Sequence, residues 1–157
     1  MTNKEIKIAY TEYASLGELS EADRILAKSA IEATGSAYAP YSNFGVGAAV
    51  RLADGEIVKG SNQENAAYPS GLCAERTALF YASASRPDTP MLSLAIAATH
   101  NGKLLSDPVT PCGACRQVMA QYQIKSGCPM EVLLIGSEKI WKFDNVDSLL
   151  PFIFDSI

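Results

Sequence analysis

The sequence has little that could bind a metal through nitrogen, because it contains a single histidine, His100, among 157 residues. Zinc sites that need two histidines, as in zinc proteases and many zinc fingers, are excluded, and so are iron sites with two histidines and a carboxylate. His100 precedes Asn-Gly, which favours a turn position over a metal ligand. A transition metal in this chain would therefore be held mainly by sulfur.

Long apolar runs and an excess of positive charge are also missing. No run approaches the ~20 apolar residues of a membrane-spanning helix. Residues 1–13 have no apolar signal-peptide core, so we expect a cytoplasmic protein without a membrane partner. The net charge of −4 argues against a surface that follows phosphate groups, so no polymeric nucleic acid is expected as a partner.

The composition predicts one globular domain over residues 1–157. Apolar residues make up 48% of the chain and charged residues 19%, which excludes a disordered or low-complexity protein. A domain of this length buries roughly 70% of the surface that its unfolded chain exposes, so it needs no disulfide bond in order to fold. The four cysteines therefore indicate metal binding or catalysis in a reducing cytosol rather than disulfides.

Helical and strand patterns alternate along the chain and predict an α/β fold. Ser20 with Asp23 three residues later is typical of a helix start, and Asp54-Gly55 between two apolar runs is typical of a hairpin turn. Apolar side chains at every second position over residues 6–10 predict an edge strand. We expect helices over 20–34, 73–85, 112–122 and 145–150, and strands over 46–52, 57–60, 91–99 and 130–135. This order predicts a mixed sheet with helices on its faces.

Three of the four cysteines occupy the starts of two predicted helices. Cys112 and Cys115 form Pro-Cys-Gly-Ala-Cys, in which the proline suits a first helical turn, and Cys73 opens Cys-Ala-Glu-Arg. The segment between them can hold one helix, one strand and a return loop, which would bring the helix starts side by side. Helix N-termini favour thiolates. Three thiolates leave the fourth tetrahedral position of zinc open, which favours a catalytic over a structural site.

Glu75 and Arg76 follow the first of these cysteines and would lie in the same cleft. A carboxylate there can take a proton from water and return it to a substrate nitrogen, and the arginine can offset the negative charge of three thiolates. Spacing alone leaves two alternatives open. One is a structural zinc site with Cys128 as the fourth ligand, and the other is a redox pair in the Cys-x-x-Cys motif.

These residues resemble the H-x-E…P-C-x-x-C signature of zinc-dependent nucleobase deaminases, in which cysteine can replace the histidine. The signature reads here as Cys73-Ala74-Glu75 and Pro111-Cys112-Gly113-Ala114-Cys115. Four longer segments are similar to those of the small, single-domain cytidine deaminases. These segments are AYAPYSNFGVGAAV, SNQENAAYPSGLCAERTA, PCGACRQV and LLPFIF. The resemblance runs from about Ser20 to the C-terminus and leaves residues 1–19 as an N-terminal extension.

The resemblance implies a three-layer α-β-α sandwich with a mixed five-stranded sheet, assembled as a homotetramer. It implies zinc-dependent hydrolytic deamination of free cytidine and 2′-deoxycytidine to uridine and 2′-deoxyuridine with release of ammonia, as a step of pyrimidine salvage. Cys73, Cys112 and Cys115 would bind one Zn²⁺ per subunit. Glu75 would transfer the proton, and Arg76 would donate to the thiolates.

The same resemblance implies roles in substrate binding. Asn62 and Glu64 resemble the pair that holds the ribose hydroxyls, and Phe44 resembles the aromatic residue that packs against the nucleoside. The backbone at Ala74 would contact the pyrimidine edge. Relatives reach the active site of a neighbouring subunit with a phenylalanine just after Leu-Leu-Pro. This sequence offers Phe152 and Phe154 there, and Phe154 fits the commoner spacing better.

Two other functions remain as alternatives. Blasticidin-type deaminases carry a closely similar C-A-E and P-C-G-x-C pattern, and a non-catalytic zinc module could keep the same scaffold. The ribose motif Asn62-Gln63-Glu64-Asn65 and the LLPFIF tail favour the nucleoside enzyme. Glu75 argues against a zinc module, because a structural site gains nothing from an added carboxylate. Gly45 is a departure, because many relatives have proline there, and it would loosen the loop that carries Phe44.

Overall fold

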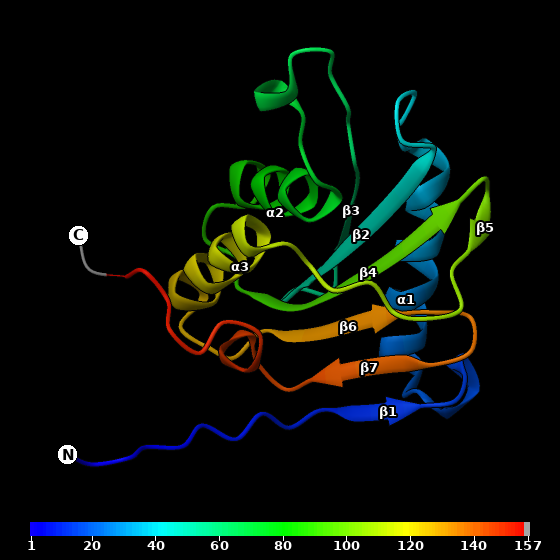
Figure 1. Cartoon of the computed structure of the whole chain (residues 1–157). Helices are drawn as coiled ribbons and strands as arrows, with labels where there is room; N and C mark the ends of the chain where they lie inside the picture. The colour runs from blue at the N-terminus through cyan, green and yellow to red at the C-terminus, as the bar shows by residue number, and fades with distance from the viewer. Residues whose placement is uncertain (156–157) are drawn as a thin grey trace.

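The structure is a computed structural model that describes residues 1–155. These residues form a seven-stranded sheet in the order β1-β7-β6-β4-β2-β3, with β5 paired to β4 (Figure 1). The strands are β1 (Thr11–Tyr13), β2 (Phe44–Leu52), β3 (Ile57–Ser61), β4 (Met91–His100), β5 (Lys103–Leu104), β6 (Glu131–Ile135) and β7 (Ile140–Phe143). The helices are α1 (Glu21–Ala33), α2 (Ala74–Ser85) and α3 (Gly113–Ser126).

The sheet lies between two helical layers, which confirms the predicted α-β-α sandwich. α1 covers one face, and α2 and α3 cover the other (Figure 1). β4 and β6 are parallel and connected through α3, whereas the other neighbouring strands pair antiparallel, so the sheet is mixed. Each face has its own apolar core. Leu26 and Leu133 belong to the core beneath α1, and Leu79, Ile96 and Met119 belong to the core beneath α2 and α3.

The sheet has more strands than the five expected, and its edge strand is displaced. β5 has two residues and β7 has four, so neither is long enough to show a clear periodicity. The edge strand expected over residues 6–10 is instead β1, at Thr11–Tyr13, and residues 1–10 lie in no strand. The strand begins no earlier than Thr11 because its partner strand, β7, is short. Tyr10 already stacks on Phe143, which is the last residue of β7. Residues before Tyr10 extend past that end.

Local signals at the element boundaries are confirmed. The Ser20 side chain accepts a hydrogen bond from the backbone N–H of Asp23 at 3.2 Å and caps α1. Gly55, in the turn between β2 and β3, has a φ of 90° that favours glycine. The short helix expected over 145–150 is a single 3₁₀ turn capped by Asn145. No helix in residues 1–155 is long and apolar enough to cross a membrane.

Two glycines let the helices on both faces approach the hairpin of β2 and β3 closely. A Cβ on Gly60 would lie 2.5 Å from the backbone nitrogen of Ala78 in α2. A Cβ on Gly47 would lie 2.2 Å from the carbonyl oxygen of Ala30 in α1. A larger residue at either position would have to move a helix backbone. The start of α2, which carries Cys73, is therefore held directly against the sheet.

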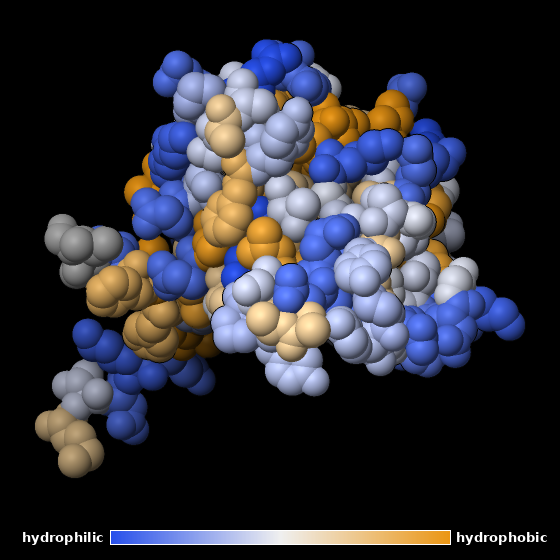
Figure 2. All heavy atoms as spheres, turned by 90° about the horizontal axis from the view of Figure 1, so that it is seen from above, coloured by the Kyte–Doolittle hydropathy of each residue, from blue (hydrophilic) through white to orange (hydrophobic). Residues whose placement is uncertain are grey.

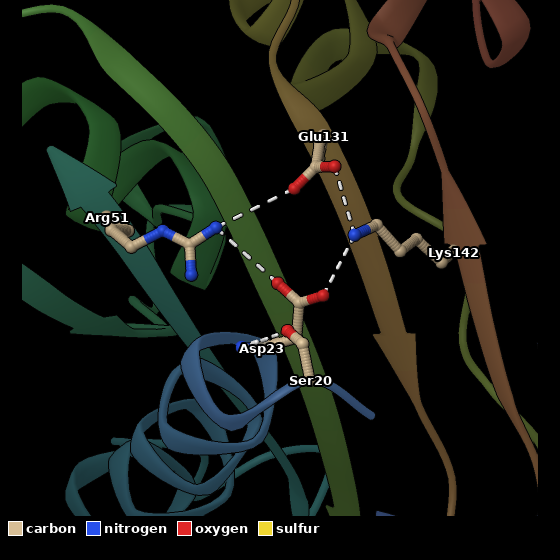
Figure 3. Close-up of polar contacts among 5 residues, drawn as sticks. All are labelled: Ser20, Asp23, Arg51, Glu131 and Lys142. Carbon is tan, nitrogen blue, oxygen red and sulfur yellow. Dashed lines mark hydrogen bonds and ion pairs between the residues drawn. The ribbon is translucent and has the colours of Figure 1, made fainter. Parts of the chain in front are cut away.

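Four charged side chains from four elements meet beside the start of α1 (Figure 3). Asp23 accepts from Lys142 Nζ at 2.8 Å and lies 3.4 Å from Arg51 Nη2, and Glu131 contacts the same two cations at 3.0 and 3.6 Å. Asp23 is only 5% exposed. Burial opposes its ionisation, but the hydrogen bond from Lys142 and the positive charges nearby hold the pKa of Asp23 below its ordinary value. This cluster ties α1 to β2, β6 and β7.

Asp23→Asn is expected to lower the free energy of unfolding by about 3 kcal/mol at neutral pH, because two largely buried cations lose one of their carboxylate partners. The pKa of Asp23 is lowered in the fold, so its contribution is present above the unfolded-state pKa of ~3.9 and is lost as the pH falls through the folded-state value. Urea unfolding of the wild type and the variant, at neutral pH and in acid, measures both effects.

The matched control for this variant lies on the same helix. Glu32→Gln removes the exposed ion pair between Glu32 and Lys59, whose charged atoms lie 3.1 Å apart, and should cost less than about 1 kcal/mol. Equal losses for Asp23→Asn and Glu32→Gln would contradict a special contribution of the buried cluster. A loss for Asp23→Asn that stays constant in acid would contradict the lowered pKa.

Candidate active site

The starts of α2 and α3 lie side by side and bring three sulfur atoms together. Cys73 is the N-cap of α2, Cys112 is the N-cap of α3, and Cys115 lies in the first turn of α3. Their Sγ atoms all lie within 4.8 Å of one another. A tetrahedral zinc ion with Zn–S bonds of about 2.3 Å holds its sulfur ligands about 3.8 Å apart. The three thiols therefore fit one such ion after a small adjustment.

The three thiols differ in exposure and in protonation. Cys115 is buried, Cys73 is half-buried and Cys112 is exposed. A hydrogen bond from Cys115, followed by donation from the Arg76 guanidinium, lowers the pKa of Cys73 to about 5 against the opposing effect of burial. The same hydrogen bond to Cys73 raises the pKa of Cys115. Three thiolates at this separation repel one another unless a cation lies among them, so the cluster is suited to a divalent metal.

Arg76 supplies positive charge to the sulfur cluster. Its Nη2 donates to Cys73 Sγ at 3.5 Å. Its Nε is buried and has no hydrogen-bond partner within residues 1–155. The guanidinium therefore has a further donor that no residue in the described part of the chain uses.

Cys128 lies away from the cluster, which removes the support for a structural site with four cysteine ligands. It follows Gly127 at the C-terminal end of α3, whereas Cys112 and Cys115 lie at the other end. A helix of this length, 14 residues, is about 21 Å long. The metal-ligand group found within residues 1–155 contains the three other cysteines and not Cys128.

Glu75 lies beside the sulfur cluster, in the first turn of α2, and is only 5% exposed. Burial, together with the negative charge of Cys73, raises the pKa of Glu75. A carboxyl group whose pKa is shifted towards neutrality can both accept and donate a proton. The geometry therefore places a group of thiols that could hold a metal ion beside a carboxyl group that can transfer protons.

A cavity of about 450 Å³ opens over this pair. Cys73, Glu75 and Cys112 line one part of the cavity, and Val46 of β2 and Ile96 of β4 contribute apolar surface. Sites that enclose small molecules typically measure about 300–1,000 Å³. The cavity can therefore hold a small molecule against the buried carboxyl group and the thiols.

Asn62, predicted to bind ribose, lines this cavity and also braces the start of β2. Its Oδ1 accepts from the backbone N–H of Val46 at 2.7 Å, and its Nδ2 donates to the carbonyl oxygen of Phe44 at 2.9 Å. The amide is thus fixed in orientation by two backbone groups. An amide oxygen has two lone pairs, so Oδ1 can accept one further hydrogen bond.

Glu64, the second residue predicted to bind ribose, also lines the cavity. It accepts from the backbone N–H of Tyr41 at 2.9 Å and from both the hydroxyl and the N–H of Ser42. The Ser42 hydroxyl, followed by the Tyr41 N–H, lowers the pKa of Glu64. The ionised carboxylate holds the loop before β2 and has capacity for further donors. The sequence did not predict this bracing role.

Two of the predicted site residues are not among those that line the cavity in residues 1–155. Phe44 is half-buried at the start of β2, with its ring 6.5 Å from that of His100. Phe154 is 69% exposed, and its backbone is bound at 2.7 and 3.2 Å by the Gln117 side chain. Neither is among the residues that line the cavity in the described part of the chain, whereas the buried Ala74 is.

Sequence reasoning missed much of the cavity wall. Leu72, Ile96, Val109 and Thr110 all line it and were not predicted as site residues. Apolar residues in a strand or a loop carry no chemical signal of their own, so Ile96 could not have been distinguished from other core residues. For Val109 and Thr110, the only available signal was their position directly before the Pro-Cys-Gly-Ala-Cys motif.

Comparison with known proteins shows which family has a sequence region like the one that forms this site. Residues 20–128 match the family described as the cytidine and deoxycytidylate deaminase zinc-binding region. This segment covers more than half of the chain and contains the three clustered cysteines and Glu75. The chain belongs to this deaminase family. The prediction of zinc as the metal agrees with the region that is matched.

Curated cytidine deaminases and their solved structures are similar to this deaminase. The cytidine deaminase of Halalkalibacterium halodurans is 52% identical over 109 residues, which cover 69% of this chain and 74% of the relative. That of Sporosarcina psychrophila is 44% identical over 134 residues, covering 85% and 91%. The crystal structure of cytidine deaminase from Burkholderia pseudomallei matches with a TM-score of 0.69 at 40% identity, covering 87% of this chain and 100% of that chain.

The deaminase match begins at the first helix. It starts at residue 20, the N-cap of α1, so β1 and the residues before it lie outside the matched region. Because 87% of this chain accounts for the whole Burkholderia chain, this deaminase has residues without a counterpart there. The N-terminal extension over residues 1–19 stays a prediction.

Proposed function

We propose that this deaminase hydrolyses free cytidine and 2′-deoxycytidine to uridine and 2′-deoxyuridine and releases ammonia, as a step of pyrimidine salvage. The observation that supports this most directly is Glu75, buried beside three clustered thiols in the wall of a cavity of about 450 Å³. Relatives that are 52% and 44% identical carry the name cytidine deaminase.

The donor set suits one Zn²⁺ per subunit. Cys73, Cys112 and Cys115 supply three ligands, which leaves one tetrahedral position for water. Zinc bound there supplies a nucleophile at neutral pH, because it lowers the pKa of a bound water towards neutrality. Arg76 offsets part of the negative charge of the thiolates through its contact with Cys73.

Glu75 moves the protons in this proposal. Its carboxylate takes a proton from the attacking water and delivers it to N3 of the cytosine ring while the C–O bond forms at C4. It then moves a proton from the new C4 hydroxyl to the amino group, so the C4–N bond breaks and ammonia leaves. One water is consumed and one carbonyl group is formed. The low exposure of Glu75, 5%, limits proton exchange with bulk water.

The remaining site residues bind the nucleoside. Asn62 and Glu64 accept hydrogen bonds from the ribose hydroxyls, since an amide oxygen and a carboxylate suit vicinal hydroxyl donors. Both residues line the cavity, as does Ala74, whose backbone contacts the pyrimidine edge. Phe44 packs against the nucleoside. The support for Phe44 is its position two residues before the lining residue Val46.

A homotetramer with shared active sites completes this proposal. Large apolar side chains are exposed in the single chain, and Figure 2 shows apolar groups among polar ones on one face and at the C-terminal end. Phe80 and Tyr81 of α2 are 40% and 63% exposed, and Phe154 is 69% exposed. Exposed apolar surface of this kind favours burial against other copies in closed symmetry. Phe154 then reaches the cavity of a neighbour.

Phe154→Ala is expected to raise KM for cytidine roughly ten-fold, equivalent to about 1.4 kcal/mol of lost binding, while the zinc content is unchanged. Phe152→Ala is the matched control, because Phe152 is also exposed, at 83%, and should change KM little. Light scattering at the assay concentration measures the assembly. An active monomer, or an unchanged KM for Phe154→Ala, would contradict a shared active site.

Ammonia release tests the function itself. We expect release from cytidine and 2′-deoxycytidine, loss of release with a chelator, and recovery when zinc is added back. Release from blasticidin alone would instead assign a blasticidin-type deaminase. A zinc-loaded chain that releases ammonia from none of these substrates would be a non-catalytic zinc module. The cytoplasm is the proposed compartment, and the four free cysteines suit its reducing conditions.

A further inference from the structure

The segment before β1 continues away from the body of the protein, and β1 itself lies at the edge of the sheet (Figure 1). β1 is the last strand in the sheet order, so within residues 1–155 its outer edge has no neighbouring strand. Residues 1–10 belong to no helix or strand. Ile6, Ile8 and Tyr10 in this segment are 53%, 55% and 51% exposed. An open edge next to exposed apolar side chains favours pairing with another strand.

Residues 4–12 are here called the arm, and the contacts of Tyr10 and Glu12 show which face of the sheet its even-numbered end occupies. Glu12 accepts a hydrogen bond from Trp141 Nε1 at 2.7 Å, and the Tyr10 ring lies 5.3 Å from the Trp141 ring. These two residues therefore share the face that carries Trp141. Side chains alternate along an extended chain, so an arm that stays extended before Tyr10 carries every second residue back to Lys4 on this face. The face reads Lys-Ile-Ile-Tyr-Glu, apolar in the middle and oppositely charged at its ends.

We propose that the arms of two copies of this chain pair as antiparallel strands about a two-fold axis at Ile8. In this register Ile8 lies opposite its own copy, Ile6 lies opposite Tyr10, and Lys4 lies opposite Glu12. Apolar side chains face apolar ones and opposite charges face each other, which stabilises cross-strand pairs. The contact is isologous, as a two-fold axis requires. Backbone hydrogen bonds along the open edges then join two sheets into one.

Other registers match less well. A shift of one position sets Lys7 opposite Ile8 and turns the apolar row against the other face of the partner. A shift of two positions sets Ile6 opposite Glu12, or Lys4 opposite Tyr10, so a charge faces an apolar side chain. The arm contains two lysines and two glutamates and is neutral overall, so it does not select a strongly charged partner. A second copy is the occupant that fits it.

This contact is separate from the deaminase site. The arm lies outside the matched family region, which starts at residue 20. None of its residues lines the cavity or belongs to the cysteine cluster in the described part of the chain. The arm contact therefore stands or fails independently of the proposed reaction.

Cysteine cross-linking of the full-length, zinc-loaded chain tests the pairing. Ile8→Cys places two thiols opposite each other, where Cβ atoms of paired strands lie about 4.5–5.5 Å apart, close to disulfide distance. In the same register the two copies of Glu5 lie roughly 20 Å apart, so Glu5→Cys is the matched control. Under mild oxidation we expect the Ile8→Cys dimer to form on the order of ten-fold faster than the Glu5→Cys dimer. The unmodified chain measures cross-linking by its native cysteines.

A mixture of single variants checks the register. Co-expressed Ile6→Cys and Tyr10→Cys chains should cross-link to each other, whereas each variant alone should not exceed the unmodified chain. Melting temperatures confirm that the body of each variant is folded. Absence of the Ile8→Cys dimer in folded protein would overturn the pairing. Equal cross-linking of Ile8→Cys and Glu5→Cys would overturn it too, because it would mean that the arms collide without a register.

Discussion

Glu75→Gln is expected to reduce kcat for cytidine deamination by about 10³-fold or more, with the zinc content still near one per chain. Glutamine keeps the shape of a side chain that is 5% exposed, so the cavity stays intact. Its amide can neither take a proton from water nor deliver one to a ring nitrogen. Steady-state kinetics together with metal analysis of the same preparation measures both quantities.

Stability separates this loss of proton transfer from a loss of folding. Burial raises the pKa of Glu75, so its ionised form costs free energy in the fold, and a neutral glutamine should not lower the melting temperature. Glu56→Gln is a control on the surface and should keep full activity. Glu56 pairs there with Arg86, the C-cap residue of α2. If Glu75→Gln turned over cytidine at nearly the wild-type rate, another group would have to move the protons.

Cys112→Ala is expected to reduce the zinc content from about one per chain to nearly zero and to abolish turnover, because two thiolates seldom retain the ion that three hold. Cys112 is the best position for this test because it is exposed, so the change removes little packing. Cys115 is 0% exposed, and its replacement by alanine would also disturb the apolar core beneath α2 and α3. Metal analysis after gel filtration measures the loss.

Cys128→Ala is the matched control for the metal ligands. Cys128 lies beyond the far end of α3 and outside the group of three thiols, so its variant should keep both zinc and turnover. Loss of zinc from Cys128→Ala would mean that the ligand set is wrong and that a four-cysteine structural site has to be reconsidered. Retention of zinc by Cys112→Ala would likewise mean that the ligand set is wrong.

The three clustered cysteines and Glu75 could be singled out from the sequence, because their signals are local. Ser20, Cys73 and Cys112 stand at helix starts, and each start depends on a few neighbouring residues such as Pro111. The hairpin turn at Asp54-Gly55 is local in the same way. Cysteine and glutamate side chains at a helix start are suited to metal binding and proton transfer. The grouping of three cysteines with a neighbouring carboxyl group therefore followed from residue type and spacing.

Other features depended on contacts between distant parts of the chain. Asp23 and Lys142 pair across 119 positions, and no local pattern in the sequence relates them. The edge strand begins at Thr11 because its partner β7 ends at Phe143. The alternation of residues 6–10 carries no information about the end of β7.

The approach of the three sulfur atoms to within 4.8 Å, and the enclosure of the cavity by Ile96 of β4, also required the assembled fold. Sequence by itself determined which groups could react, because capping and side-chain chemistry act over a few residues. Only the tertiary structure decided which of them meet and what surrounds them, because strand register and helix packing are set by the whole core at once.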